Sequence, residues 1–388
     1  MSPAPIKVVH VITRLDLGGA QRNTLHTVRS LDPERFAAVL VCGRGGVLDE
    51  ELASWPQDGP RSLYVDDLVR EVSPGHDLRA FLTLRRLFLE EKPAVVHTHS
   101  SKAGILGRLA ARAAGVPVIV HTFHGFGFHE GQSRVKKWLY VLAERLAGSM
   151  STALVFVSRD NQEYARRYGL GDPARYVLIR SGVRLSELPA RCDATAKKQS
   201  LGLPPGSRLV LSVGNFKPQK NPADFLAAAR IVARAQPEAA FAFVGDGPLR
   251  AEMEAGLGEL GPRFLLPGWR HDVAELLAAA DVFVLTSLWE GLPRALVEAM
   301  KSGVAAVCYA TDGVKDVVRD GENGFLVAQG DVAALARRVE ELLEDEAMRK
   351  RLGAAAAASI GLEFDIDAMV RRQEQLYLRL VGATGQLS

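Results

Sequence analysis

The feature that most constrains the fold is a repeated alternation of short apolar runs with longer amphipathic stretches. In the first half of the chain, runs such as IKVVHVI, AVVHTHS and VPVIVHTF alternate with patterns of helical periodicity such as AGILGRLAARAAG. Continuously apolar strands separated by amphipathic helices are typical of a parallel sheet that helices cover on both faces. The alternation restarts with RLVLSVGN and continues through DVFVLTS. The sequence therefore predicts an α/β protein with two doubly wound parallel sheets.

A polar segment separates the two alternations. After Pro189 the periodicity gives way to RCDATAKKQSLGLPPGSR, which has the proline, glycine and lysine content of a linker. We therefore expect a first Rossmann-like domain over residues 1–188 and a second over residues 189–363. The amphipathic pattern in residues 364–388 predicts a C-terminal helix that packs back on the first domain. A chain of 388 residues is long enough for two such domains.

The composition argues against several classes of protein. Its 47% hydrophobic and 24% charged residues are ordinary for a soluble globular protein. The three cysteines lack the spacing of metal ligands, which favours free thiols in a reducing cytoplasm. Because His10 and Arg14 interrupt the N-terminal apolar run, we expect a first strand there and not a signal peptide. No stretch approaches the ~18–20 apolar residues of a transmembrane helix.

Charge and glycine patterns narrow the choice of ligand. Residues 1–185 carry 25 Lys and Arg against 18 Asp and Glu, whereas residues 186–388 carry 23 against 27. This excess fits an anionic partner of the first half, although a solvated surface gives the same imbalance. FVGDGPLR has no third glycine, and no Walker loop with its lysine occurs, so NAD and ATP sites are not expected. We expect no nucleic-acid partner.

The segment LWEGLPRALVEAM contains the sharpest candidate site. Glu290 closes a strand-to-helix turn, and Glu298 lies eight residues further on. We expect a helix from about Pro293, so that Gly291 and Leu292 offer backbone N–H groups to a diphosphate. Eight residues of helix advance about 12 Å, more than the roughly 5–9.5 Å between paired glycosidase carboxylates. The spacing therefore favours two glutamates that grip two ends of one extended ligand.

Several motifs in sequence order resemble those of retaining family-4 glycosyltransferases, which have the GT-B fold. They are the paired glutamates with the EGLP turn, LDLGGAQ, HTFHGF, VGNFKPQKNP, FVGDGPLR and LPGWRHDV. The resemblance runs along nearly the whole chain. It implies two Rossmann-like domains that face a central cleft, the first binding the acceptor and the second binding the nucleotide sugar.

The resemblance also implies roles for single residues. Gly18 and Gly19 match the glycine loop that lets the donor diphosphate approach the backbone. His124 matches the histidine beside the donor sugar. Glu290 would contact the sugar and Glu298 the ribose, and we expect His124 and Glu290 to be catalytic residues.

The segment VGNFKPQKNP departs from the family pattern at one position. Family members commonly have an arginine directly after this glycine, and here Asn215 takes its place. Lys220 matches the family's lysine, which is directed at the donor phosphates, and joins the expected catalytic residues. Lys217 is a candidate for the missing charge, although a lysine lacks the bidentate geometry of arginine.

Trp269 and Arg270 follow a glycine where the family's nucleobase pocket forms. An indole or a guanidinium plane there is able to stack on a base. The alternative for Trp269 is an ordinary interior anchor.

We expect no metal ion to take part in the chemistry. His97 and His99 have the spacing of metal ligands, but we place them on opposite faces of their strand, which would keep them from sharing an ion. Asp365 and Asp367 form an Asp-x-Asp pattern that precedes the final helix, so we expect them to cap that helix.

Residues for the acceptor or a membrane are expected around the segment FGFHEGQSRVKKWLYVLAERLAG. Basic and aromatic residues beside an acceptor pocket fit docking on an anionic bilayer, and the alternative is a solvated helix with Trp138 in the core. The residues that we assign to acceptor or membrane are His99, Lys102, Phe126, Phe128, Arg134, Lys136 and Lys137.

Together these patterns lead to one functional hypothesis. We expect a transferase that moves a hexose-type sugar from a UDP or GDP sugar to a glycan or polyprenyl-linked acceptor, for cell-surface polysaccharide. Retention of anomeric configuration is implied by the resemblance. We expect the protein in the cytoplasm, where it is able to bind the membrane peripherally. The alternatives are a nucleotide-sugar epimerase of related fold and a non-catalytic protein that binds sugar nucleotides.

Overall fold

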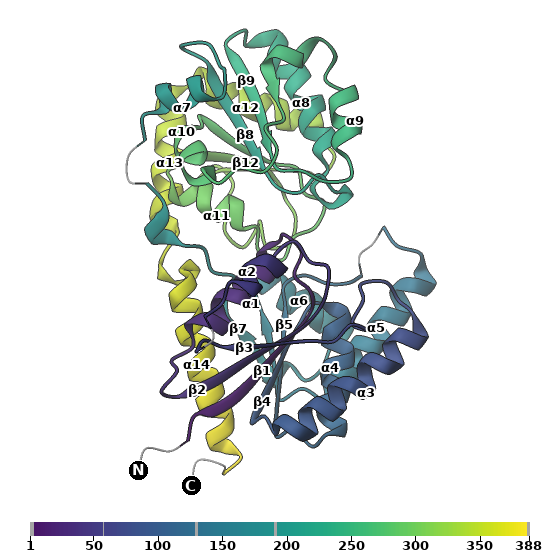
Figure 1. The fold of residues 1–388 in the computed structure, drawn as a ribbon. Helices are drawn as coiled ribbons and strands as arrows, with labels where there is room; N and C mark the ends of the chain where they lie inside the picture. Colours follow the sequence, from purple (N-terminus) through teal and green to yellow (C-terminus); the bar gives the residue numbers. More distant parts are fainter. Residues whose placement is uncertain (1–3, 57, 129–130, 190–191, 386–388) are drawn as a thin grey trace. The chain divides into compact units, whose positions relative to one another are not determined.

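The computed structural model describes residues 4–56, 58–128, 131–189 and 192–385, in two compact units (Figure 1). Unit 1 comprises Met1–Gly182 and Ile366–Ser388, and unit 2 comprises Val183–Asp365. The chain thus enters unit 2 slightly before the boundary that we expected at residues 188 and 189. Each unit is built on one parallel sheet, as the alternating pattern predicts.

Unit 1 contains a seven-stranded sheet of order β3-β2-β1-β4-β5-β6-β7. The chain order reverses between β1 and β4, which is the arrangement of doubly wound folds. Its strands are β1 (Ile6–Arg14), β2 (Phe36–Gly43), β3 (Arg61–Tyr64), β4 (Val95–His99), β5 (Val118–Phe123), β6 (Ala153–Phe156) and β7 (Tyr176–Leu178). Its helices are α1 (Gly19–Ser30), α2 (Asp49–Ala53), α3 (Pro74–Glu91), α4 (Ser101–Ala113), α5 (Arg134–Ser149), α6 (Arg159–Tyr168) and α14 (Ile366–Ala383).

Alternate residues of these strands face opposite sides of the sheet. On one side, Val8, Val95 and Val118 form a core with Val370 and Tyr377 of α14. On the other side, the residues one position further along each strand pack against α3 and α4; they are Val9, Val96 and Ile119. Because both faces are covered by apolar contacts, polar side chains of these strands are buried unless they lie at a strand end.

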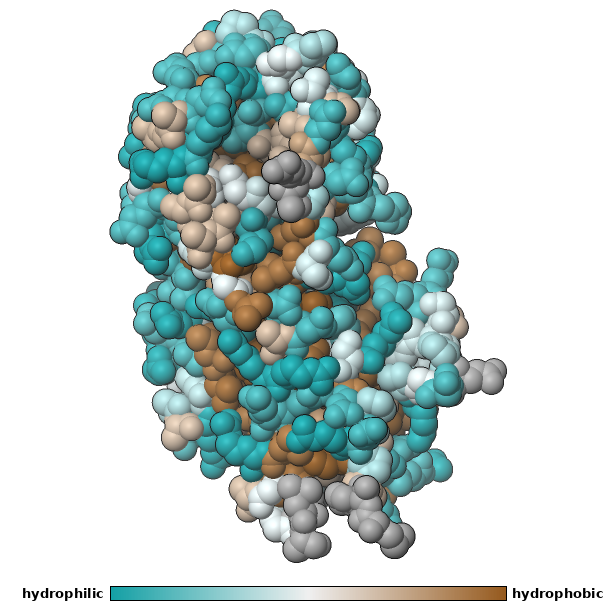
Figure 2. Space-filling view, turned by 90° about the vertical axis from the view of Figure 1, so that its left-hand side faces the viewer, coloured by the Kyte–Doolittle hydropathy of each residue, from teal (hydrophilic) through white to brown (hydrophobic). Residues whose placement is uncertain are grey.

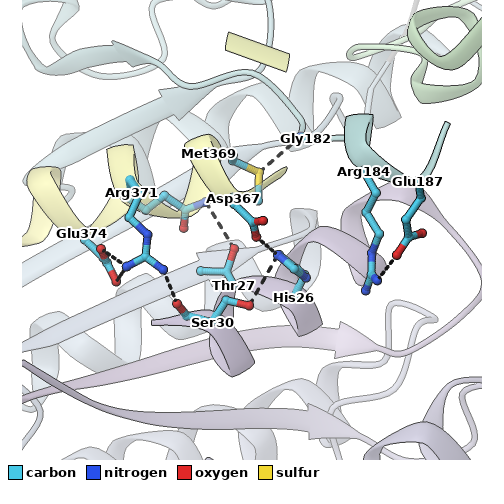
Figure 3. A network of polar contacts seen from close by, with 11 residues as sticks. His26, Thr27, Ser30, Gly182, Arg184, Glu187, Asp367, Met369, Arg371 and Glu374 are labelled. Atoms are coloured by element: carbon cyan, nitrogen blue, oxygen red, sulfur yellow. Dashed lines mark hydrogen bonds and ion pairs between the residues drawn. The ribbon is translucent and has the colours of Figure 1, made fainter. Parts of the chain in front are cut away.

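The C-terminal helix α14 belongs to unit 1 (Figure 3). Asp367 lies in its first turn and pairs with His26 of α1 at 2.8 Å. The backbone N–H of Gly182 donates a hydrogen bond to the sulfur of Met369 at 3.4 Å. A Cβ atom on Gly182 would lie 2.4 Å from the Cα of Ile366, so only glycine permits this approach.

Unit 2 contains a six-stranded sheet of order β10-β9-β8-β11-β12-β13. Its strands are β8 (Arg208–Val213), β9 (Ala239–Val244), β10 (Phe264–Leu265), β11 (Val282–Leu285), β12 (Ala305–Tyr309) and β13 (Phe325–Val327). Its helices are α7 (Ala194–Ser200), α8 (Pro222–Ala235), α9 (Arg250–Ala255), α10 (Val273–Ala279), α11 (Arg294–Lys301), α12 (Val332–Glu344) and α13 (Glu346–Ser359). Residues of α8 and α12 pack with alternate residues of β8, β9, β11 and β12 in one core.

Most of the surface on the side shown in Figure 2 is hydrophilic, with exposed hydrophobic residues between the hydrophilic ones. Among the helices in the described ranges, none combines the length and the apolar character that crossing a bilayer requires.

A buried ion pair joins α4 to α5 in unit 1. The guanidinium of Arg108 lies 2.5 Å from the carboxylate of Glu144, and both side chains are buried. Arg108 also donates to the backbone oxygen of Gly104 at 2.7 Å. A charge removed from water in this way is stabilised by its partner, so the loss of one partner costs more than the pair contributes.

We expect Glu144→Gln to lower the free energy of unfolding by about 3 kcal/mol, because it leaves the Arg108 guanidinium buried without a counter-charge. Urea titration followed by circular dichroism measures this change. Replacing both Arg108 and Glu144 by leucine should recover much of the loss.

The matched control is Glu90→Gln, which breaks the exposed i,i+4 pair with Arg86 on α3. An exposed pair of this kind contributes about 0.5 kcal/mol or less. Equal losses in Glu144→Gln and Glu90→Gln would show that burial of the Arg108–Glu144 pair has no energetic consequence.

Candidate functional site

In unit 2, two loops at the carboxyl ends of neighbouring strands bring Lys220 and Glu290 together. Lys220 ends a 3-10 turn (Pro218–Lys220) after β8, and Glu290 lies in the loop between β11 and α11. The ammonium of Lys220 contacts the carboxylate of Glu290 directly. Glu290 is buried and Lys220 is partly buried. Two residues that the motifs singled out separately are thus in contact.

Hydrogen bonds between the two loops hold this pair in place. The hydroxyl of Thr286 is within hydrogen-bond distance of the backbone oxygens of Lys220 and Asn221, at 3.0 and 2.9 Å. The N–H of Leu288 donates to the oxygen of Gln219 at 2.8 Å. Asn221 has a φ of 45°, a left-handed conformation that asparagine tolerates better than most residues. The contact between Lys220 and Glu290 is therefore set by the backbone.

Helix α11 begins at Arg294, and Pro293 occupies its N-cap position. Gly291 and Leu292 lie just before Pro293, outside the helix, which begins one residue later than the motif predicts. Glu290 does not lie on the helix, so the continuous helix that our estimate of about 12 Å between Glu290 and Glu298 assumed is absent. Glu298 lies on α11, where its carboxylate is 3.6 Å from the guanidinium of Arg294.

The two other residues of the expected phosphate site lie in the loop after β8. Asn215 accepts a hydrogen bond through its backbone oxygen from the N–H of Lys217 at 2.8 Å. Lys217 directly precedes the 3-10 turn that ends at Lys220. Asn215, Lys217 and Lys220 thus belong to one short loop at the carboxyl end of β8.

Trp269 lies on the surface of unit 2 with 49% of its area exposed, which excludes the interior anchor. Its neighbour Arg270 forms two hydrogen bonds of 2.7 Å with the carboxylate of Asp272. Asp272 also pairs with Lys197 at 3.0 Å. The Arg270 guanidinium, followed by Lys197, holds the pKa of the Asp272 carboxyl well below its usual range.

In unit 1, the expected glycine loop lies at the start of α1. Gly18 is the N-cap residue, with extended backbone, and Gly19 is the first helical residue. The backbone N–H groups of a first helical turn have no partner within the helix and are available to an anion.

Four histidines, from β1, β4 and the segment after β5, gather under α14. The rings of His97 and His99 are 4.3 Å apart between centroids, so our assignment of the two residues to opposite faces was wrong. Residues two apart on a strand share a face, because side chains alternate. His10 pairs with His97 in the sheet and points to the same side. His124 follows β5 and lies within hydrogen-bond distance of His99.

Within the described residues, nitrogen atoms of His10, His97 and His99 lie within 4.8 Å of one another. His97 already has partners at both nitrogens, since Nδ1 is 2.5 Å from the hydroxyl of Tyr377 and Nε2 is 2.7 Å from that of Thr122. Coordination of a metal by His97 would break one of these hydrogen bonds.

Burial keeps these imidazoles neutral. It lowers the pKa of His10 to about 3 and that of His124 to about 4. The pKa values of His97, His99 and His121 also lie well below the usual value, first through burial. Neighbouring imidazoles lower them further, and at His121 the Arg108 guanidinium does so as well.

A pocket in unit 1 opens beside this cluster. It lies at the carboxyl ends of β4, β5 and β6, below α1 and α14, and its lining includes His99, His124, Asn23, Arg180 and Ser181. His99 and His124, which the motifs assigned to acceptor and donor sugar, therefore line one pocket. The sequence analysis missed His10, Thr122 and Tyr377, although two-residue periodicity along β1 and β5 was sufficient to place His10 and Thr122 on this face.

Three residues assigned to acceptor or membrane have internal partners. Phe128 is only 2% exposed and packs against Tyr164, so its assignment to a membrane surface was wrong. Phe126 is partly buried in the same aromatic cluster. The ammonium of Lys102 pairs with Asp77 at 2.5 Å and joins α4 to α3.

Helix α5 presents an exposed apolar stripe. Trp138 is 62% exposed, so it is not a core residue. Apolar residues at the spacing of one helical face lie exposed beside it, and they are Val135, Leu139, Leu142 and Leu146. Arg134 and Lys136 are exposed at the start of the helix, and the Lys137 ammonium lies 4.9 Å from the ring centroid of Tyr168.

Comparison with known proteins identifies both halves of the chain. Residues 18–182 match the family described as glycosyl transferase 4-like domain, and residues 193–359 match glycosyl transferases group 1.

Two characterised relatives have similar sequences. The UDP-Gal:alpha-D-GlcNAc-diphosphoundecaprenol alpha-1,3-galactosyltransferase of Escherichia coli is 34% identical over 97% of both chains. A Campylobacter jejuni alpha-1,4-N-acetyl-D-galactosaminyltransferase, named for a polyprenol-diphosphate-linked substrate, is 25% identical over 89% of this chain and 91% of its own.

Solved structures share the fold at lower sequence identity. Anabaena Alr3699/HepE, in a complex with UDP and glucose, has a TM-score of 0.80 at 21% identity, covering 96% of this chain and 99% of its own. Sucrose-phosphate synthase from Thermosynechococcus elongatus has a TM-score of 0.82 at 20% identity, covering 97% and 100%. These structures confirm the GT-B fold.

We expect unit 1 to lose stability as the pH falls from about 6.5 towards 4. Above about pH 6.5 the buried histidines of unit 1 are unprotonated in both the folded and the unfolded state. Below that pH the unfolded chain binds protons at these histidines, whereas the folded state excludes them. Each buried histidine then contributes a slope of about 1.4 kcal/mol per pH unit. Urea titrations at several pH values measure the slope of the unfolding free energy against pH. In His121→Gln this slope should be smaller by the contribution of one histidine.

The control is Val120→Ala, which removes buried apolar volume from the same strand and no titrating group. It should lower stability equally at every pH and leave the slope unchanged. A slope in His121→Gln equal to that of the unmodified protein would contradict a neutral, buried His121.

Proposed function

Since the chain belongs to the family-4 glycosyltransferases, we propose that it transfers a hexose-type sugar from a UDP or GDP sugar to a polyprenyl-linked glycan, with retention of anomeric configuration. The activities for which the two relatives are named support this acceptor class and a role in cell-surface polysaccharide synthesis. The observation that carries the proposal is the contact between Lys220 and Glu290 beside the start of α11.

The Lys220 ammonium is our candidate for the charge that stabilises the leaving diphosphate. Preorganised positive groups aimed at developing negative charge are a large source of catalysis. The first N–H groups of α11, which Gly291 and Leu292 precede, would add to this stabilisation. Lys217 lies in the same loop as Lys220 and would supplement its charge where Asn215 replaces the family's arginine. We propose that the transfer requires no metal ion.

The remaining donor contacts are assigned by chemistry and position. Glu298, partly buried on α11, would accept hydrogen bonds from ribose hydroxyls, and the exposed ring of Trp269 would stack on the base. Glu290 would contact the transferred sugar, as would His124 of unit 1. Gly18 and Gly19 would allow the diphosphate to approach the start of α1.

The exposed face of α5 supports peripheral binding to an anionic membrane at the cytoplasmic surface. Trp138 and the apolar stripe beside it would enter the interface between lipid headgroups and acyl chains, and the basic residues would meet the lipid phosphates. This arrangement would bring the enzyme to a lipid-linked acceptor.

The proposed reaction is tested by release of nucleoside diphosphate from UDP and GDP sugars in excess EDTA. We expect release to require a polyprenyl-diphosphate-linked glycan.

Glu298→Ala should weaken donor binding by about tenfold or more, the effect of one hydrogen bond to a charged group. Calorimetric titration measures that change.

The matched control is Glu341→Ala, which breaks a comparable helical pair with Arg338 on α12 and should leave donor binding unchanged.

Conversion of the donor sugar without acceptor would identify an epimerase, and binding without turnover would identify a regulatory protein. Activity that EDTA abolishes and Mn²⁺ restores would contradict the metal-free mechanism.

We expect the triple substitution of Arg134, Lys136 and Lys137 by glutamate to reduce co-sedimentation with anionic liposomes. Each basic residue near the surface contributes roughly 1 kcal/mol, and high salt should weaken binding of the unmodified protein. Trp138→Ala should weaken binding in a less salt-dependent way, because its contribution is apolar.

A control with the same change of charge replaces three exposed basic residues outside α5, namely Arg44, Arg86 and Lys350. It should bind liposomes much more strongly than the α5 triple variant. Equal binding by the two triple variants would mean that net charge, and not the face of α5, determines membrane binding.

A further inference from the structure

Three imidazoles in unit 1 form a continuous hydrogen-bonded series, which we call the histidine chain (His10, His99 and His124). Nδ1 of His10 lies 3.1 Å from Nε2 of His99, and Nδ1 of His99 lies 3.2 Å from Nε2 of His124. The rings of His10 and His99 are nearly parallel, at 7°. At the two ends, His10 Nε2 and His124 Nδ1 have no hydrogen-bond partner within the described part of the chain.

The histidine chain is separate from the polar contacts next to it. His97 has both nitrogens engaged, by Tyr377 and Thr122. His121 lies on the other face of the sheet and pairs with the hydroxyl of Thr98 at 2.9 Å. The proton positions in the three chain members are therefore linked to one another and not to these neighbours.

A neutral imidazole has one N–H donor and one acceptor nitrogen. When each ring is neutral, both hydrogen bonds of the chain form only if all three N–H groups point in the same direction. In one direction every ring is protonated at Nδ1, and His124 offers an N–H group at its unpartnered end. In the other direction every ring is protonated at Nε2, and His124 offers a lone pair.

The buried end of the chain distinguishes the two directions. His10 Nε2 and His124 Nδ1 are both buried and both lack a partner among the described residues, so either direction leaves one N–H group without a protein acceptor. His124 lines the pocket, where a bound oxygen is able to accept its N–H, whereas His10 is fully buried and is not among the lining residues. Buried N–H groups without a partner are rarer in proteins than acceptors that lack one. This favours a proton on Nδ1 of His10, which in turn places the protons of His99 and His124 on Nδ1.

We propose that His10 and His99 are positioning residues that fix His124 in its Nδ1–H tautomer, so that His124 acts as a neutral hydrogen-bond donor and not as a base. This inference rests on the proposed contact between His124 and the donor sugar. A donor at this place recognises an oxygen acceptor such as a sugar hydroxyl. Neither His10 nor His99 needs to touch the sugar for this effect.

The tautomer is measured on the free protein, without any sugar nucleotide. Selective ¹⁵N labelling of histidine distinguishes Nδ1–H from Nε2–H in neutral rings, and single His→Gln variants assign the signals. We expect His124 to be the Nδ1–H form near neutral pH. In His99→Leu, His124 should shift toward the Nε2–H form, which an unconstrained neutral histidine favours.

His121→Gln is the matched control, because His121 is buried in the same sheet but lies outside the chain. It should leave the His124 signals unchanged. The proposal is overturned if His124 is Nε2–H in the unmodified protein, or if its tautomer is the same in His99→Leu. Stoichiometric zinc in the purified protein, whose removal alters the His10 and His99 signals, would also overturn it.

Kinetics then test the positioning role. His99→Leu should lower kcat for transfer by about tenfold, roughly the worth of one hydrogen bond, with little change in the donor KM. His99→Gln, which retains one donor and one acceptor, should recover part of the loss and serves where the leucine variant does not fold. Full activity in both His99 variants alongside an inactive His124→Ala would overturn the positioning role.

A different result separates this proposal from the proposed function. If His124→Ala transfers sugar at the normal rate, the sugar contact of His124 fails, and the positioning role fails with it. The tautomer measurement on the free protein still decides whether the histidine chain has the proposed direction.

Discussion

The burial of both faces of two parallel sheets is the constraint on which the rest of this structure depends. Apolar side chains of each strand pack under helices, so ligands have access mainly at the carboxyl ends of strands and the loops that follow. In unit 2 the loops after β8 and β11 meet at such an edge and bring Lys220 to Glu290. In unit 1 the ends of β4 and β5 provide His99 and His124. The chemistry of each unit is therefore concentrated at one edge of its sheet.

The same constraint gives the histidines of unit 1 their character. A polar residue in a covered strand loses its contact with water, so it becomes neutral or acquires a partner. His97 has partners at both nitrogens, whereas His10 and His124 each have one within the described residues. A fully apolar residue at position 10 would pack under α14 without this polar cost. Because position 10 is a histidine that forms a hydrogen bond with His99, the buried end of the histidine chain is able to influence the proposed tautomer of His124 at the edge of the pocket.

Much of the fold follows from sequence periodicity, because the apolar runs correspond to strands whose two faces are buried. Separate motifs marked Lys220 and Glu290 as site residues, but the contact between them was not predicted from the sequence. Local geometry was less predictable. The helix after Glu290 begins only at Arg294, since the loop first turns through Gly291 and Pro293. Phe128 lies within a glycine-rich loop and is nevertheless buried, because Tyr164 of α6, far along the chain, packs against it. Such tertiary contacts leave no periodic pattern in the sequence.

The contact between Lys220 and Glu290 has an electrostatic consequence for the proposed diphosphate site. The carboxylate neutralises much of the ammonium's charge, so this pair alone is a weak match for a doubly charged leaving group. An ammonium has three donors, however, and is able to bind a phosphate oxygen while it keeps its hydrogen bond to Glu290. Glu290 then fixes the position of Lys220 before the donor binds, which reduces the reorganisation that the transition state requires.

The charge that Glu290 cancels has to come from elsewhere at the same edge. On the proposed function, the start of α11 would supply part of it through its N–H groups, and Lys217 would supply a full charge from the loop of Lys220. On this argument the asparagine at position 215 is tolerated because the diphosphate is stabilised by several partial contributions and not by one arginine.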